Sequence, residues 1–200
     1  MQIVSVEKRR NQAKRYQIRL DNGADFVLYA SEVRRFGLTE GEELSDEAYA
    51  SIVEEVLIPR ARQRALHLLE KQDRTEANLK QKLREGGYPD EVADNAVAYV
   101  LSYHYVDDRR YADNYIYFHK DEKSRQRLKQ DLLAKGIAKE LIEQAIEEGY
   151  ETDERELIEK LLKKKHYDPT NADKKEQAKM YRFLASRGFQ SGDIMDAMRA

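Results

Sequence analysis

The 200-residue sequence contains no cysteine and no tryptophan, and it has only three prolines. Without thiols, disulfides, thiolate metal sites and cysteine nucleophiles are excluded. No apolar run is long enough to cross a membrane, and the first residues lack the continuous apolar stretch of a signal peptide. We therefore expect a soluble cytoplasmic protein with no membrane segment.

The sequence also lacks the motifs of common enzyme classes. No Gly-x-Gly-x-x-Gly, P-loop or Gly-x-Ser-x-Gly pattern occurs. The four histidines never recur at helical spacing, which disfavours a metal site: His67, His104, His119 and His166. Asp107 and Asp108 are adjacent, so on a helix they would diverge by about 100°, and we interpret them as a helix cap. We expect no catalytic residues, no cofactor and no metal.

Charge dominates what is present. Charged residues make up 37% of the chain and hydrophobic residues 40%, with a mean hydropathy of −0.87. Most side chains must therefore face water, which favours several small bundles over one large core. A disordered chain is the alternative, but 13 tyrosines and regular Leu/Ile spacing argue against it.

The first part of the chain has the pattern of β-strands. Residues 16–20 alternate apolar and polar, Asn22-Gly23 forms a turn, and residues 26–29 are β-prone. An Asn-Gly pair between two such runs predicts a hairpin, because both residues tolerate positive φ. Residues 3–6 could add a third strand.

Helices are predicted to follow this hairpin. Ser31 is a candidate cap for a short helix over 32–36, and Ser45 or Asp46 for a second helix. Pro59 either interrupts or restarts the helical pattern.

From residue 60 onward the chain is repetitive. Three glycines, each followed by an apolar residue, lie 49 and 52 residues apart: Gly87-Tyr88, Gly136-Ile137 and Gly188-Phe189. A leucine stands five residues before each apolar residue, and further apolar residues stand six and ten after each glycine. The matched positions are Leu83, Leu132 and Leu184; Ala93, Ile142 and Ile194; and Val97, Ile146 and Met198.

This pattern predicts a helix that ends at a C′ glycine in the left-handed conformation, followed by a second helix facing the same core. An earlier helix supplies a third wall: Ala65, Leu68 and Leu69; then Tyr111, Tyr115 and Phe118; then Leu157 and Leu161. The predicted fold is mainly α, with an N-terminal β-hairpin module at 1–56. Three tandem three-helix repeats follow at 57–106, 107–152 and 153–200, in an elongated array.

At these repeats the sequence resembles the RecX family. The resemblance rests on RTEANLKQKLREGGY (74–88), YVDDRRYADNY (105–115), RLKQDLLAKGI (127–137) and KMYRFLASRGFQSGDI (179–194). One departure is Ser124, where many relatives open the helix with glycine. Serine is the better N-cap, so we expect that helix to form.

The resemblance implies a regulator that binds the RecA recombinase filament on single-stranded DNA. It implies inhibition of RecA ATPase, strand exchange and co-protease activity, and hence a role in DNA repair, recombination and the SOS response. It implies no chemistry by the chain itself. Direct binding of single- or double-stranded DNA without RecA is the alternative function, and a general helical-repeat adaptor is another. We expect a monomer.

Basic residues recur on equivalent helices of the first two repeats. Segments 59–85 and 109–139 are each basic by about four to five charges, whereas the segments after them are acidic. The residues that we select as candidate contacts are Arg64, Lys82, Arg125, Arg127 and Lys129. They would form either a cationic stripe for an acidic partner or phosphates, or ordinary solvated helix faces.

Aromatic residues cluster between these two repeats, and we expect most of them to pack in the core or at the junction rather than stack on bases. They are Tyr99, Tyr103, Tyr105, Tyr111, Tyr115, Tyr117 and Phe118.

Overall fold

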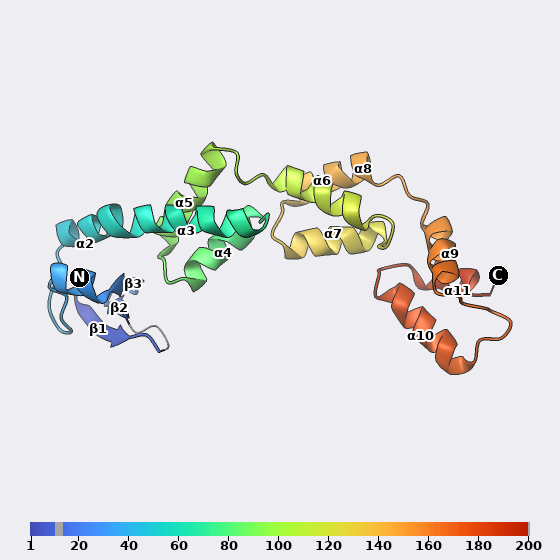
Figure 1. The fold of residues 1–200 in the computed structure, drawn as a ribbon, viewed down its shortest axis with the longest axis horizontal. Helices are drawn as coiled ribbons and strands as arrows, with labels where there is room; N and C mark the ends of the chain where they lie inside the picture. Colours follow the sequence, from blue (N-terminus) through green and yellow to red (C-terminus); the bar gives the residue numbers. More distant parts are fainter. Residues whose placement is uncertain (11–13, 200) are drawn as a thin grey trace. The chain divides into compact units, whose positions relative to one another are not determined.

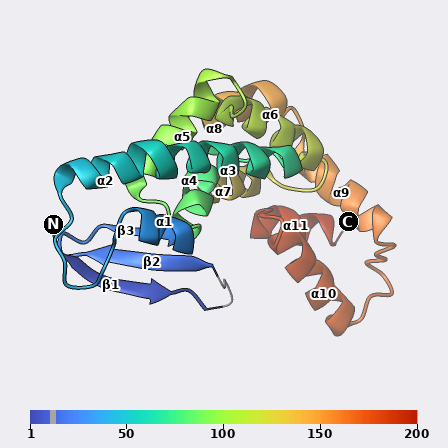
Figure 2. The same ribbon diagram turned by 60° about the vertical axis from the view of Figure 1, so that its left-hand side comes forward.

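The computed structural model describes residues 1–10 and 14–199 (Figures 1 and 2). It divides into two compact units, Met1–Asp107 and Asp108–Ala200. The first unit contains a small sheet and three-helix repeat 1, and the second contains repeats 2 and 3. The chain is mainly helical, as predicted.

The sheet has three antiparallel strands in the order β1 (Ile3–Lys8), β2 (Arg15–Leu20) and β3 (Asp25–Tyr29). The hairpin and the additional strand are thus confirmed. The turn differs in detail from the predicted Asn-Gly type. Gly23 has φ 86°, whereas Asn22 is not among the non-glycine residues with positive φ. The Asn22 side chain instead accepts a hydrogen bond from the Ala24 amide at 3.0 Å.

Helix α1 (Ala30–Arg35) follows β3 directly. The Glu32 carboxylate accepts a hydrogen bond from the Tyr29 amide at 2.7 Å, so the helix begins at Ala30 and the prediction that Ser31 caps it is wrong. Ser45 does cap α2 (Asp46–Ile52), because its Oγ accepts from the Ala48 amide at 3.2 Å.

Three helical segments run on without a break: α2, the π-helical turn η1 (Val53–Leu57) and α3 (Ile58–Lys71). Pro59 lies in the first turn of α3. Proline has no amide hydrogen and its ring crowds the carbonyl four residues earlier. Directly before Pro59, the Ile58 amide donates to the Val53 carbonyl five residues earlier, which is the bond of a π turn. The proline therefore restarts the helix and does not end it.

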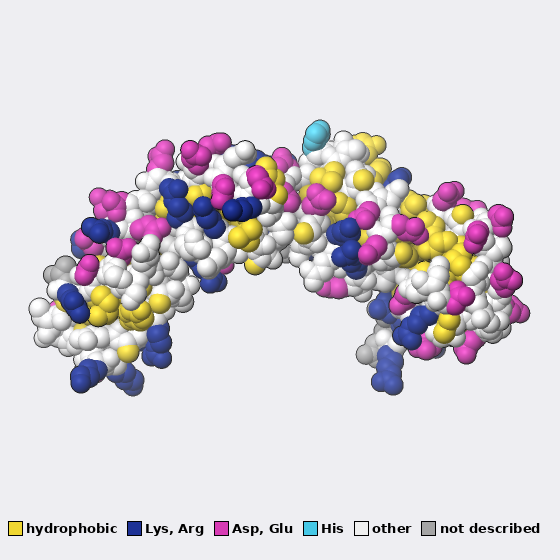
Figure 3. Space-filling model, turned by 180° about the vertical axis from the view of Figure 1, so that it is seen from behind, with side chains coloured by type: hydrophobic (Ala, Val, Ile, Leu, Met, Phe, Trp, Pro, Cys, Tyr) yellow, Lys and Arg dark blue, Asp and Glu magenta, His cyan; other side chains and the backbone are white. Residues whose placement is uncertain are grey.

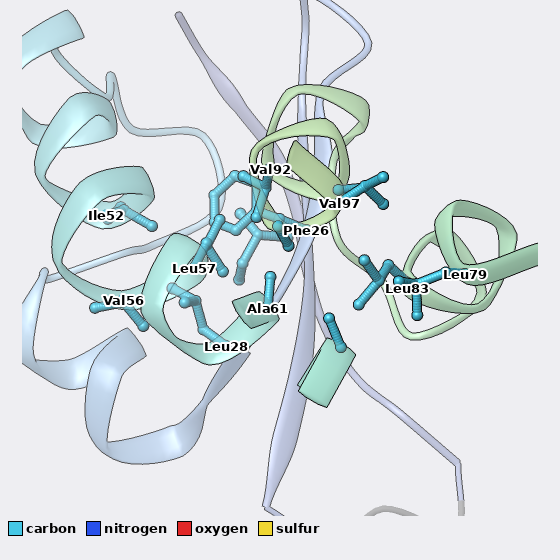
Figure 4. Close-up of a cluster of buried hydrophobic side chains, with 14 of the residues drawn as sticks. Phe26, Leu28, Ile52, Val56, Leu57, Ala61, Leu79, Leu83, Val92 and Val97 are labelled. Atoms are coloured by element: carbon cyan, nitrogen blue, oxygen red, sulfur yellow. The ribbon is translucent and has the colours of Figure 1, made fainter. Parts of the chain in front are cut away.

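The sheet and repeat 1 share one hydrophobic core (Figure 4). Phe26 and Leu28 of β3 meet Leu57 and Ala61 of the long helical segment. Helices α4 (Glu76–Glu85) and α5 (Asp90–Ser102) close this core with the residues Leu79, Leu83, Val92 and Val97. The strands are therefore an integral layer of the first unit.

The second unit contains two smaller cores. Repeat 2 consists of α6 (Asp108–His119), α7 (Arg125–Ala134) and α8 (Lys139–Gly149). Repeat 3 consists of α9 (Glu154–Lys164), α10 (Lys174–Ala185) and α11 (Ser191–Ala197). The leucines predicted to precede the three glycines, Leu83, Leu132 and Leu184, are buried, whereas the predicted wall residue Leu69 is partly buried.

One predicted wall residue was assigned wrongly. Ala112 and Ile116 are the buried residues of α6, whereas Phe118 is 72% exposed. Residue 118 follows 116 by roughly 200° around the helix, so both cannot face the same core.

The predicted glycine endings are confirmed. Gly87, Gly136 and Gly188 have φ values of 89°, 82° and 83°. In repeat 1 the Tyr88 amide donates to the Leu83 carbonyl at 3.3 Å, and the Ile137 amide does the same to Leu132 in repeat 2. This is the Schellman bond from C″ to C3.

Candidate partner-binding surfaces

In repeat 1, most of the basic side chains are engaged within the unit. Arg62 donates two hydrogen bonds to Asn95 Oδ1, at 2.8 and 3.1 Å, and lies over the Tyr99 ring. Lys82 pairs with Glu85 at 2.7 Å, one turn along α4. Arg64 is exposed on α3, and no hydrogen bond or ion pair joins it to another described residue. Of the two candidates in this repeat, Arg64 is thus the uncommitted cation.

In repeat 2, the three candidates on α7 point in different directions. Arg125 and Lys129 are four residues apart and share a face, whereas Arg127 is turned away from both. Arg125 donates to the Tyr150 carbonyl at 3.1 Å, and its guanidinium lies over the Tyr150 ring. Lys129 lies 3.9 Å from a Glu143 carboxylate oxygen. The three charges therefore do not form one continuous face of the helix.

A different group of residues gathers between α6 and α7. Along α6, an aromatic residue recurs every four positions. From residue 123 through α7, a charged residue recurs at the same spacing. We call this group the α6–α7 ladder: Tyr111, Tyr115 and His119 with Lys123, Arg127, Asp131 and Lys135. Sequence reasoning missed it as a unit, although the four-residue spacing is visible in the printed sequence. The ladder carries three lysine or arginine charges and one carboxylate.

Asp131 is the centre of the ladder. Its carboxylate accepts hydrogen bonds from Lys123 Nζ at 2.8 Å and from the Tyr115 hydroxyl at 3.0 Å. Arg127 Nε lies 3.0 Å from its other oxygen. Burial alone would raise the pKa of Asp131, but the bonds from Lys123 and Tyr115 and the charge of Arg127 outweigh it and lower that pKa. The carboxylate therefore stays ionised and holds the two cations in place.

The neighbouring His119 ring packs 4.4 Å from the Tyr115 ring, centre to centre. Burial lowers the pKa of His119, and the positive charge of Lys123 lowers it further. His119 is therefore predominantly neutral at pH 7. The surplus positive charge of the ladder comes from Lys123, Arg127 and Lys135.

The N-terminus of α7 holds repeats 2 and 3 together within the second unit. Ser124 is fully buried and accepts a hydrogen bond from the Arg127 amide at 3.1 Å, as predicted for an N-cap. The Ser124 amide donates to the Arg187 carbonyl at 3.0 Å, and the Arg125 amide donates to Glu154 Oε1 at 2.8 Å. A Cβ added at Gly188 would lie 2.7 Å from Ser124 Oγ. Glycine is thus required at position 188 for two reasons: the backbone approaches Ser124 closely, and its φ is positive.

Gly87 has a comparable double role in the first unit. A Cβ there would lie 2.3 Å from Val27 Cγ2 of β3. The glycine ending of α4 therefore packs directly against the sheet.

Several predicted junction aromatics are instead exposed. Tyr103, Tyr105, Tyr117 and Phe118 each have more than half of their surface accessible, while Tyr111 and Tyr115 pack at the edge of the repeat 2 core. In Figure 3, basic and acidic side chains are interspersed with exposed apolar groups across the visible face. Among the described residues, no group of three or more His, Asp or Glu side chains could hold a metal ion.

None of the helices described is both long and apolar enough to span a membrane.

A small antiparallel sheet followed by three three-helix units, with charged and tyrosine-rich surfaces, defines a helical-repeat protein. Family models for the first, second and third three-helix domains of RecX match residues 61–99, 107–146 and 152–198. The chain belongs to the RecX family of regulatory proteins.

Individual relatives agree with this assignment. The chain is 30% identical over 204 residues to the regulatory protein RecX of Caldanaerobacter subterraneus subsp. tengcongensis, covering 99% of this chain and 98% of the relative. It is 32% identical over 196 residues to RecX of Leuconostoc mesenteroides, covering 96% of this chain and 72% of that protein.

Solved structures show the same fold. A crystal structure of a regulatory protein RecX, 28% identical, matches with a TM-score of 0.59 and covers 98% of both chains. RecX from Lactobacillus salivarius, 23% identical, matches with a TM-score of 0.53 over 72% of this chain and 95% of that chain, which supports the fold alone.

Proposed function

We propose that the protein binds the RecA recombinase filament and inhibits its ATPase, strand-exchange and co-protease activities, thereby modulating DNA repair and the SOS response. The observation that carries this proposal is the match to the family, which extends over all three repeats and nearly the whole chain. The protein acts by binding, and its own side chains supply contacts rather than chemistry.

The contact residues that we propose are the accessible cations of repeats 1 and 2. Arg64 is uncommitted, and Lys82 is held only by an exposed ion pair, which contributes less than about 1 kcal/mol and exchanges readily. Arg127 and Lys129 are partly exposed in the second unit. An acidic protein surface or DNA phosphates would attract these charges at long range.

Arg125 is the least suitable of the original candidates for a charge-reversal test. It contacts Tyr150, and its amide is capped by Glu154, so its replacement would disturb the junction between repeats 2 and 3. A loss of inhibition by an Arg125 variant would not separate binding from folding.

The test is a variant that carries Arg64→Glu, Lys82→Glu and Lys129→Glu. Arg127 is left unchanged, because a glutamate there would face the Asp131 carboxylate. Single exposed charges contribute little, so several must be reversed together. We expect at least about a tenfold higher concentration for half-inhibition of the RecA ATPase on single-stranded DNA, with an unchanged helical circular dichroism signal. A variant with Lys139→Glu, Lys164→Glu and Lys175→Glu, on exposed positions of α8, α9 and α10, is the control that changes net charge by the same amount.

Full inhibition by the folded variant would contradict the proposed contact residues. An equal loss in the control would show a general effect of net charge. Co-sedimentation of the unaltered protein with RecA filaments tests the partner itself.

The α6–α7 ladder favours a second candidate function, direct binding of nucleic acid without RecA. Tyrosine rings beside lysine and arginine side chains are typical of surfaces that bind single strands. Binding to bare single-stranded DNA that weakens steeply with salt would support it, since each phosphate contact releases counterions. Binding only in the presence of RecA would exclude it.

A further inference from the structure

Repeat 3 contains an open groove of 660 Å³ beside α10 and α11. Its apolar lining comes from Tyr167, Tyr181, Met195 and Met198, and its charged lining from Lys174 and Arg199. The Tyr181 hydroxyl donates to Ser191 Oγ at 3.0 Å and so ties the two helices together. The groove lies entirely within one repeat and is part of its folded structure.

The lining has the character of a binding surface for an apolar side chain. Met195 is 39% exposed, although burial of a methionine side chain would be favourable. Methionine is unbranched and polarisable, and it adapts to differently shaped partners. Two methionines and two tyrosines in one groove therefore suit a single large apolar side chain of varied shape.

The charged residues that line the groove are of one sign. Neither Lys174 nor Arg199 forms an ion pair with another residue that the structure describes. The nearby carboxylate of Asp168 already accepts bonds from the Thr170 amide, the Thr170 hydroxyl and the Asn171 amide group. Glu176 is close enough to act on Tyr167 but does not line the groove. The lining of the groove thus carries two positive charges and no carboxylate, while the carboxylates of Asp168 and Glu176 lie near Tyr167 outside the lining.

We propose that this groove binds an acidic peptide segment that presents one large apolar side chain. The apolar side chain packs against Met195, Met198 and the two tyrosines, while flanking carboxylates pair with Lys174 and Arg199. This proposal does not depend on contact of repeats 1 and 2 with RecA, because it concerns a different repeat and different side chains.

The test uses the full chain labelled with ¹³C at the methionine methyl groups. The chain has four methionines, so the spectrum is simple and each signal is assigned by substitution. The probe is a short synthetic peptide of aspartate, glutamate and serine with one central phenylalanine. We expect the Met195 and Met198 signals to shift on titration and the Met1 signal to stay in place.

Two further peptides separate the contributions: one with serine in place of phenylalanine, and one with asparagine and glutamine in place of the acids. Each should bind at least about tenfold more weakly. Lys174→Glu with Arg199→Glu should weaken the parent peptide by about tenfold or more. Lys163→Glu with Lys179→Glu, at exposed positions of the same repeat outside the groove, is the matched control and should have no effect.

No shift of Met195 at saturating peptide would overturn the proposal. Equal binding of the peptide without phenylalanine would also overturn it, by showing simple charge attraction. Movement of the Met195 signal with protein concentration alone, without peptide, would assign the groove to a second copy of the chain instead.

Discussion

At the scale of single residues, His104 and His166 take a conformation that side-chain-bearing residues seldom adopt. Their φ values are 57° and 55°. The Tyr105 amide donates to the Val100 carbonyl at 3.0 Å, and the Tyr167 amide donates to Leu162 at 3.1 Å. Both histidines therefore occupy the C′ position of a Schellman ending. Glycine takes that position at residues 87, 136 and 188.

This comparison predicts different outcomes for substitutions at the two kinds of C′ position. Gly188→Val should lower the free energy of unfolding by more than about 1 kcal/mol, because positive φ disfavours a branched residue and its Cβ would meet Ser124. His166→Gly should change stability by less than about 1 kcal/mol, since relief of strain offsets the greater entropy of the unfolded chain. Urea unfolding followed by circular dichroism measures both.

Gly192→Ala is a suitable control, because nothing lies within 4 Å of the added Cβ. A stable Gly188→Val protein with unchanged unfolding would show that the close contact with Ser124 is not maintained in solution.

At the scale of helices, the α6–α7 ladder joins two antiparallel elements through one carboxylate. The Asp131 side chain is 15% exposed, and its pKa is held below the ordinary value by Lys123, Tyr115 and Arg127. A carboxyl group with a lowered folded-state pKa stabilises the fold above its unfolded pKa. That stability is lost as the pH falls through the folded value.

Asp131→Asn should therefore lower the free energy of unfolding by about 1–3 kcal/mol at pH 7, because it leaves Lys123 without its ionic partner. The difference between the original protein and the variant should shrink below about pH 4, the region where an aspartate titrates. Urea unfolding at several pH values measures this difference. A difference that does not change with pH would contradict the role of the charge.

The helical repeats were predictable from the sequence because their information is local. A C′ glycine, the leucine at C3 and the following apolar residue stand at fixed offsets, and the φ values of Gly87, Gly136 and Gly188 agree. The ladder was not predicted, since it depends on the register between two helices. The outward direction of Phe118 shows a related limit: its helical spacing from Tyr111 and Tyr115 suggested a wall residue, but the buried residues of α6 are Ala112 and Ile116.

At the scale of the whole molecule, each hydrophobic cluster formed by the described residues lies within one unit. The first cluster runs from Ile3 to Val106, and the other two lie between Ala112 and Met198. A unit that contains its complete core can fold alone.

We therefore predict that fragments 1–107 and 108–200 each fold when expressed separately. Each should show a helical circular dichroism spectrum and a cooperative thermal transition. As a control, the first unit is cut at residue 56, within η1. Neither resulting fragment should fold, because the cut divides the shared core. Failure of either of the two complete fragments to fold would show that its core needs the other unit.

The shared core of the first unit also constrains folding during synthesis. Phe26 and Leu28 leave the ribosome early, but Val100 and Val106, which belong to the same core, are translated some seventy residues later. At roughly 5–20 residues per second, the nascent strands wait for several seconds with their apolar face uncovered. Of the three cores, that of the first unit spans the longest stretch of sequence, so its first strands stay uncovered longest during synthesis.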